Sequence, residues 1–177
     1  MSATRVPTRI AWALEQLTLT GRDRLLEIGC GSGLALSALA ARRPAPRVVG
    51  IDRSSEQCRR ARAHNAAAIA AGRIDVKQLA LTDAPTTFGS RAFTIVLAIN
   101  VNEFWTNPEQ AFNIAAHLLT PRGRLCLVYE SPSAPAARRL TDLLPLYADS
   151  SGFVASPPEL AKPGGRLLSL IARRGSR

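Results

Sequence analysis

The sequence predicts an α/β protein in which a doubly wound, mostly parallel sheet of seven strands carries helices on both faces. Two observations predict this class. Short apolar stretches alternate with helix-forming stretches through five units, and a glycine-rich turn follows the first apolar stretch. In addition, the last two apolar stretches are joined by a loop without a helix, which is typical of antiparallel neighbours. We therefore expect one antiparallel strand in the edge region of the sheet.

The first half of the chain alternates between helix and strand with clear end signals. Ser54 and Gln57 have the spacing of a capping box, and Gly72 can end the helix that they begin. We expect a helix over 8–19, a strand over 24–28, a helix over 34–43, a strand over 47–51, a helix over 54–71 and a strand over 74–79.

The second half continues the alternation with less regular connections. Residues 82–91 lack periodicity and predict a loop or a very short helix. Asn107 and Pro108 suit the N-cap and the first position of a helix, whereas Pro145 predicts a kink or break in a later one. We expect a strand over 93–101, a loop over 102–107, a helix over 108–119, a strand over 125–129, a helix over 135–148, and strands over 152–155 and 166–172.

The composition is that of an ordered globular chain. Apolar residues make up 46% of the 177, so one domain over residues 1–177 can bury a sizeable core. Within it we expect an N-terminal helix in 1–20, a core in 21–130, and a helix with an antiparallel strand pair in 131–177. No stretch has the length of a membrane span or the pattern of a secretory signal, so we expect a cytoplasmic location and no membrane partner.

The cysteines and histidines predict neither disulfide bonds nor a metal site. Cys30, Cys58 and Cys126 are an odd number without metal-ligand spacing, so we expect reduced thiols. His64 and His117 lie in separate expected helices without a second ligand nearby. We therefore expect no bound metal.

The chain is strongly basic, with a formal net charge of +10. Such a charge favours anionic partners, among them nucleic acid. The arginines are spread along the chain, however, and no aromatic residues alternate with them to stack on bases. A solvated basic surface is the interpretation that this pattern favours, and nucleic-acid binding is the alternative.

The residues after the first strand form the strongest chemical motif. Glu27 precedes a turn in which Gly29, Gly31 and Gly33 alternate with other residues. Glycines at the end of a strand let the backbone turn sharply and let a ligand approach the amides. A dinucleotide-binding motif would need its third glycine at Leu34, so the spacing disfavours a nicotinamide-dependent oxidoreductase.

Asp52 ends the second expected strand, beside the glycine turn. A carboxylate at this position of a doubly wound sheet can accept hydrogen bonds from both hydroxyls of a ribose. The alternative is an acid that is solvated or that stabilises the amino end of the next helix.

Together, residues 27–33 and 49–52 resemble the first two motifs of the class I S-adenosylmethionine-dependent methyltransferases. Residues 93–96 and 118–123 add weaker matches, and the resemblance covers residues 20–130. It implies a Rossmann-like fold and a methyl-transfer reaction. It also implies S-adenosyl-L-methionine as the cofactor and S-adenosyl-L-homocysteine as the product.

The resemblance also implies roles for single residues. Glu27 and the turn from Gly29 to Gly33, Cys30 and Gly31 included, would hold the methionine part of the cofactor, and Asp52 would hold the ribose. The family often has an acid near Ala80 and Leu81 that binds adenine, so here we expect apolar contact through Leu81. The remaining implied cofactor contacts are Arg53 beside the adenine, and Asn100 and Val101 near the sulfonium. Thr94 stands where the family often has Asp.

The methyl acceptor is not determined by these motifs. The Asn/Asp-Pro-Pro-aromatic motif of amino-methylating nucleic-acid enzymes is absent after the fourth strand, and so is a nucleophilic cysteine. A small organic acceptor is therefore favoured. The alternatives are a basic RNA methyltransferase and a noncatalytic protein that binds S-adenosylmethionine or S-adenosylhomocysteine. The sequence does not indicate an oligomeric state.

Candidate acceptor contacts lie in the few segments outside the cofactor motifs. Glu103 is the candidate acid–base group, and Phe104 with Trp105 could form an apolar wall beside the acceptor. The alternative is that Glu103 is a solvated acid and that the two aromatics cover the core. The other candidate substrate-binding residues are Trp12, Asn102 and Glu130.

Overall fold

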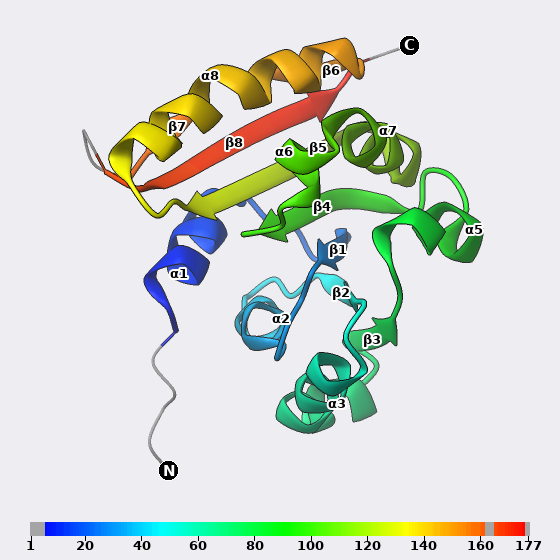
Figure 1. The fold of residues 1–177 in the computed structure, drawn as a ribbon. Helices are drawn as coiled ribbons and strands as arrows, with labels where there is room; N and C mark the ends of the chain where they lie inside the picture. The colour runs from blue at the N-terminus through cyan, green and yellow to red at the C-terminus, as the bar shows by residue number, and fades with distance from the viewer. Residues whose placement is uncertain (1–5, 162–164, 176–177) are drawn as a thin grey trace.

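The computed structural model describes residues 6–161 and 165–175, and one mixed sheet forms its centre (Figure 1). The strand order is β3-β2-β1-β4-β5-β8-β6, with β7 beside β8. β1 to β5 pair in parallel, whereas β8 is antiparallel to β5 and to β6. The strands are β1 (Arg24–Ile28), β2 (Arg47–Asp52), β3 (Ile74–Gln78), β4 (Phe93–Ile99), β5 (Leu119–Glu130), β6 (Phe153–Ala155), β7 (Glu159–Leu160) and β8 (Leu167–Arg174).

This topology confirms the predicted fold class and the antiparallel pair near the edge. The sheet has eight strands in the described residues where we expected seven, because the two-residue β7 pairs with β8 within the expected loop. β5 is also longer than expected. Its ladder with β4 begins at Leu119 opposite Phe93, then shifts register and resumes at Arg124, so Pro121 and Gly123 lie within the irregular part.

Helices cover both faces of the sheet. α1, α2 and α3 share one apolar cluster with the sheet, and α6, α7 and α8 share another. α8 runs along β8 (Figure 1). The helices are α1 (Thr8–Glu15), α2 (Leu34–Ala40), α3 (Ser55–His64), α4 (Ala66–Ala70), α5 (Ala84–Phe88), α6 (Glu103–Thr106), α7 (Pro108–Leu118) and α8 (Ala134–Ser150), with a 3₁₀ turn at Leu81–Asp83.

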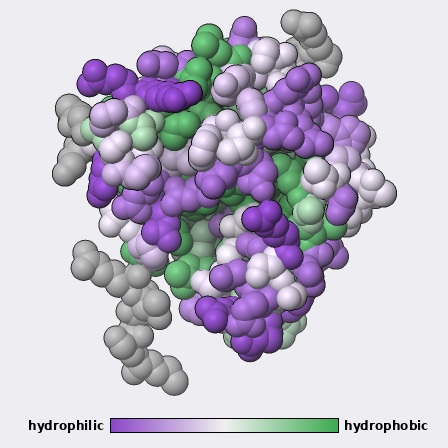
Figure 2. Space-filling model, viewed as in Figure 1, coloured by the Kyte–Doolittle hydropathy of each residue, from purple (hydrophilic) through white to green (hydrophobic). Residues whose placement is uncertain are grey.

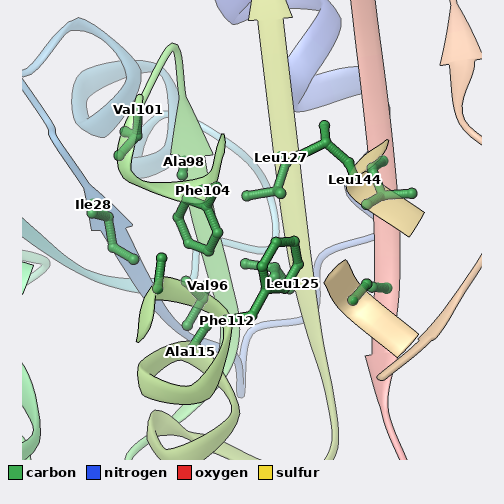
Figure 3. Close-up of a cluster of buried hydrophobic side chains, with 14 of the residues drawn as sticks. Ile28, Val96, Ala98, Val101, Phe104, Phe112, Ala115, Leu125, Leu127 and Leu144 are labelled. Atoms are coloured by element: carbon green, nitrogen blue, oxygen red, sulfur yellow. The ribbon is translucent and has the colours of Figure 1, made fainter. Parts of the chain in front are cut away.

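The core follows from strands that are buried on both faces. Leu25 and Leu26 of β1 are both fully buried but belong to different clusters, as successive side chains of a strand must. Figure 3 shows Phe104 and Phe112 gathered with side chains of β4, β5 and α8. The two rings meet edge to face with centroids 5.2 Å apart, a favourable aromatic geometry.

The expected loop over 102–107 is wrong, because α6 occupies part of it. The carbonyl of Asn102 accepts hydrogen bonds from the amides of Trp105 and Thr106, which closes one helical turn. This turn brings Phe104 fully into the core against Phe112. Burial of one aromatic side chain thus organises a segment that has no helical periodicity.

We expected a kink or a break at Pro145, and the break is wrong, since α8 continues to Ser150. Proline removes one backbone hydrogen bond from a helix interior. Leu144 and Ala148 on either side of Pro145 are fully buried, and most helical stability in proteins comes from such packing. Ser133 begins the helix, because its hydroxyl accepts a hydrogen bond from the amide of Ala136 at 3.3 Å.

The single helix expected over 54–71 is divided at Asn65. Ser54 caps α3 as predicted, accepting a hydrogen bond from the amide of Gln57 at 3.3 Å. The side-chain amide of Asn65 donates to the carbonyl of Ala61 at 2.9 Å and to that of Gly33 at 3.0 Å. An asparagine side chain that bonds nearby backbone in this way competes with helical bonding.

A partly buried polar contact joins the amino ends of β1 and β4. Thr94 donates from its hydroxyl to a carboxylate oxygen of Asp23 at 2.8 Å, and its oxygen accepts from the amide of Arg24 at 3.1 Å. Burial would raise the pKa of Asp23, but hydrogen bonds from Thr20 and Thr94 hold it below its ordinary value. Thr94 therefore anchors β4 at the position where the resembling family often has Asp.

Thr94→Val is expected to lower the free energy of unfolding by about 1–2 kcal/mol, because the Asp23 carboxylate loses a hydrogen-bond donor while the side-chain shape is kept. Urea unfolding measures this change. Thr94→Ser is the control, since it keeps the hydroxyl and should retain most of the stability. Equal stability of the valine variant and the unchanged chain would show that the contact does not anchor β4.

Candidate active site at the carboxyl ends of the strands

One cavity lies where the order of the parallel strands reverses, and a second cavity adjoins it. The chain goes from β1 outward to β2 and β3, then returns to place β4 on the other side of β1. Ligands of doubly wound proteins bind at this point, beyond the carboxyl ends of the strands. Figure 2 shows hydrophobic surface in hollows near the middle of one face, surrounded by hydrophilic residues.

The first chamber has a volume of about 620 Å³ and is formed by the ends of four strands. The second chamber has a volume of about 560 Å³ and lies between the end of β5 and α8. Both volumes are typical of small-molecule sites. The first is lined by residues 28–29, 51–53, 79–82, 100–103 and 106, and the second by 100, 102, 105, 129–132, 136, 139, 140, 143 and 147.

Gly29 forms the wall of the first chamber at the end of β1. Its φ of +66° lies in the left-handed region, and an added Cβ would lie 2.9 Å from a methyl carbon of Val101. Glycine is therefore required twice here, by the turn and by the close approach of the segment after β4. Gly31 and Gly33 also have positive φ but do not line the chamber.

Asp52 holds the glycine turn as well as lining the first chamber. One carboxylate oxygen accepts from the amide of Gly31, and the other accepts from the amide of Ser54, each at 2.9 Å. Two more hydrogen bonds hold the turn, since the amide of Cys30 donates to Ile51 of β2 and that of Gly33 donates to Cys30 within the turn. Three amides of the predicted ligand-binding turn therefore donate within the protein. An ionised carboxylate has about four lone-pair sites, so Asp52 can still accept from a ligand.

Asn65 is a positioning residue that sequence reasoning missed. It is buried, and its side-chain amide binds the carbonyl of Gly33 at the end of the turn. A Cβ on Gly33 would lie 2.5 Å from that nitrogen, so a side chain at position 33 would displace the Asn65 amide. The signal in the sequence was Asn65 itself, because asparagine has low helix propensity and stands here within an alanine-rich helix.

Glu27 lies in the sheet beneath the glycine turn and is almost fully buried. Burial is the larger cause and the nearby Asp52 carboxylate the smaller one, and together they raise the pKa of Glu27 to about 8. Within the described residues, one of its carboxylate oxygens has no hydrogen-bond partner. A buried, unpaired acid at this place suits a cationic group on a ligand, although Glu27 itself does not line the first chamber.

The wall between the chambers is held by contacts between β4 and β5. Asn100, with a φ of +56°, accepts from the amide of Glu130 and donates its own amide to Val128, each at 2.8 Å. The hydroxyl of Tyr129 donates to the carbonyl of Val101 at 2.6 Å. Asn100 and Asn102 line both chambers, so these contacts fix the boundary between them. Tyr129 was not anticipated, because its role depends on the strand pairing.

The remaining predicted site residues divide among several places. Arg53, Leu81, Val101 and Glu103 line the first chamber, together with the unanticipated Thr82. Trp105 and Glu130 line the second chamber. Phe104 lies in the core, Cys30 is buried behind the turn, and the half-buried Trp12 lies on α1, so these three line neither chamber.

Other functional signals are few in the described part of the chain. The three cysteines are free and buried. No group of three or more His, Cys, Asp and Glu side chains in these residues could hold a metal ion. None of the described helices combines the length and the apolar character needed to cross a membrane.

The pH dependence of stability is expected to report the Glu27 carboxyl group. Its pKa is 4.5 ordinarily and about 8 in the folded chain, so the folded state binds more protons between these values. The free energy of unfolding should therefore fall as pH rises from 4.5 to 8 in the absence of ligand. Glu27→Gln should flatten this fall, as measured by urea unfolding at several pH values.

The control for this measurement is Glu56→Gln. Hydrogen bonds from Arg59 and Arg60 lower the pKa of the exposed Glu56 to about 2, so its titration lies outside the interval. If Glu27→Gln leaves the pH dependence unchanged, the carboxyl group is not held in the protonated form that its burial requires.

Comparison with known proteins agrees with this geometry. Residues 26–125 match a family described as a methyltransferase domain. No curated protein sequence matches the chain. The putative methyltransferase solved with the Haloferax volcanii Trm112 methyltransferase activator is 15% identical with a TM-score of 0.80, over 96% of this chain and 90% of that one.

Two further solved structures share the fold. A putative sarcosine dimethylglycine methyltransferase from Galdieria sulphuraria is 16% identical with a TM-score of 0.73, over 94% of this chain and 85% of that one. A geranyl diphosphate C-methyltransferase from Streptomyces coelicolor, solved with S-adenosyl-L-homocysteine, is 13% identical with a TM-score of 0.73, over 94% of this chain and 75% of that one.

The family match covers more than half of the chain and includes the glycine turn, Asp52 and the segment after β4. The strand order, the chambers and the buried acid beneath the turn are consistent with it. The chain therefore belongs to the methyltransferase-domain family of class I S-adenosylmethionine-dependent methyltransferases.

Proposed function

We propose that this methyltransferase takes S-adenosylmethionine into the first chamber and a small organic acceptor into the second. The observation that carries the proposal is the shared wall, since Asn100 and Asn102 line both chambers. Methyl transfer requires two molecules to meet end to end, and two adjoining chambers of small-molecule size meet that requirement.

The side chains around the first chamber fit the chemistry of the cofactor. Glu27 offers an unpaired carboxylate oxygen to the amino group of the methionine part. Asp52 keeps lone pairs for the ribose hydroxyls while it holds the turn. Leu81, with Ile51 and Arg53, offers an apolar and cationic slot for adenine in place of the acid that the family often has.

The reaction places modest demands on the protein. When bound, the cofactor supplies an electrophilic methyl group, whose bond to sulfur breaks as its bond to the acceptor forms. The main task of the side chains is then to hold the nucleophilic atom of the acceptor in line with the bond between sulfur and the methyl carbon, about 3–3.5 Å from that carbon. A general base is needed only where the acceptor must lose a proton. Glu103 on the first chamber and Glu130 on the second are the candidates beside the shared wall.

A small acceptor is supported by the shape of the second chamber. It is a cavity between β5 and α8, whereas recognition of RNA needs a long basic surface with stacking side chains. If the protein methylates RNA, or binds the cofactor without transferring a methyl group, the proposal of a small acceptor is wrong.

We also propose that the chain acts in the cytoplasm, because its three buried free cysteines suit a reducing compartment.

Calorimetry with S-adenosylmethionine, S-adenosylhomocysteine and NAD tests the cofactor assignment. Both adenosyl ligands should bind and NAD should not. Asp52→Ala should weaken binding by about 1–3 kcal/mol, because the ribose hydroxyls lose a partner and the amides of Gly31 and Ser54 lose the acceptor that holds the turn. Asp83→Ala is the matched control, since Asp83 is an exposed acid that does not line the chamber. Tight NAD binding without a response to the adenosyl ligands would overturn the assignment.

The two glutamates beside the wall can be compared directly. If an acceptor must lose a proton, Glu103→Gln should lower turnover about tenfold, or about 1.4 kcal/mol of barrier, with the cofactor dissociation constant nearly unchanged. Glu130→Gln is the paired variant from the other chamber. The comparison uses an acceptor found by screening small molecules and RNA for methyl transfer. Full turnover in both variants would mean that positioning alone accounts for catalysis.

A further inference from the structure

The second chamber has an apolar wall built from two helices. Leu140, Leu143 and Tyr147 lie three and four residues apart on α8, which puts them on one face of that helix. Trp105 of α6 adds a large aromatic side chain that is 44% exposed. An exposed tryptophan beside a cavity suits contact with the apolar body of a ligand.

The two charged side chains that line this chamber differ in whether a neighbouring charge offsets them. Glu130 forms an ion pair with Arg9 at 3.5 Å, so its charge is offset by a neighbour. Arg139, an exposed residue of α8, also lines the chamber, and its side chain makes no ion pair or hydrogen bond to any other described residue. The uncompensated charge of the second chamber is therefore the positive charge of Arg139.

Two further features of the second chamber also favour an anionic ligand group. The amino end of α8 lies against the chamber, where Ala136 forms part of the lining, and the amino end of a helix attracts anions. Ser131, just before that helix, lines the chamber with only 4% of its surface exposed, and its hydroxyl has no partner among the described residues. A buried hydroxyl without a partner is a donor that a ligand can satisfy.

We propose that the second chamber binds a small, largely apolar molecule that carries a carboxylate. Arg139 binds the carboxylate, and the apolar body packs against Trp105 and the leucines of α8. The identification of this molecule as the methyl acceptor rests on the proposed function. The binding preference itself does not, because it follows from the lining of the chamber alone.

Fluorescence of Trp105 tests the preference without the reaction. The chain has two tryptophans, so Trp12→Phe leaves Trp105 as the reporter. The probes are 3-phenylpropanoate, 3-phenylpropanamide and 3-phenylpropylamine, which share one apolar body and differ in charge. The carboxylate should bind about tenfold more tightly than the amide, in keeping with a charged hydrogen bond. The amine should bind most weakly, because Arg139 repels it, and added salt should narrow these differences.

Arg139→Gln in this background should remove the preference for the carboxylate over the amide. Arg138→Gln is the control, since the neighbouring Arg138 is exposed and does not line the chamber. Tightest binding of the amine, no response of Trp105 to any probe, or equal effects of the two arginine variants would overturn the proposal. Calorimetry with S-adenosylmethionine reports the first chamber separately, so failure of the cofactor assignment would leave this result standing.

Discussion

The two hydrogen bonds to the Asp52 carboxylate are the interaction on which the candidate site depends. They tie the turn after β1 to the amino end of α3, so the end of β2 sets the position of both neighbours. Asn65 supports the same turn from α3 and α4 by binding Gly33. The turn is thus held from two sides before any ligand binds, which is how a rigid scaffold lowers the cost of ordering a loop on binding.

The buried Glu27 carboxyl group is the second feature on which the candidate site depends. An acid without a complete set of partners costs stability, and native structures keep such groups mainly where function requires them. Its position beneath the braced turn means that the chain cannot easily relax around it. A cationic group on a ligand would offset the free-energy cost of burying this acid. The unpaired Glu27 carboxyl group therefore favours binding of such a ligand at the expense of the stability of the unliganded chain.

The strand pairing between β4 and β5 gives the site its division into two chambers. Asn100 is bound to β5 twice, because its side-chain oxygen accepts from the amide of Glu130 and its own amide donates to Val128. The hydroxyl of Tyr129 donates to the carbonyl of Val101. α6 then directs Phe104 into the core and leaves Trp105 exposed at the second chamber. The same short segment therefore stabilises the core and lines the site.

The sequence by itself determined the fold class, the order of the main elements, and the motif of Glu27, the glycine turn and Asp52. These features depend on local periodicity and short spacing, which are readable along the chain. Only the tertiary structure decided that Glu103 and Glu130 line different chambers, that Phe104 and Trp105 face opposite surroundings, and that Asn65 braces the turn. The positions of Glu130 and Asn65 depend on contacts between segments far apart in sequence. Those of Glu103, Phe104 and Trp105 depend on one helical turn that burial in the core stabilises. Local helix or strand propensity does not report such contacts.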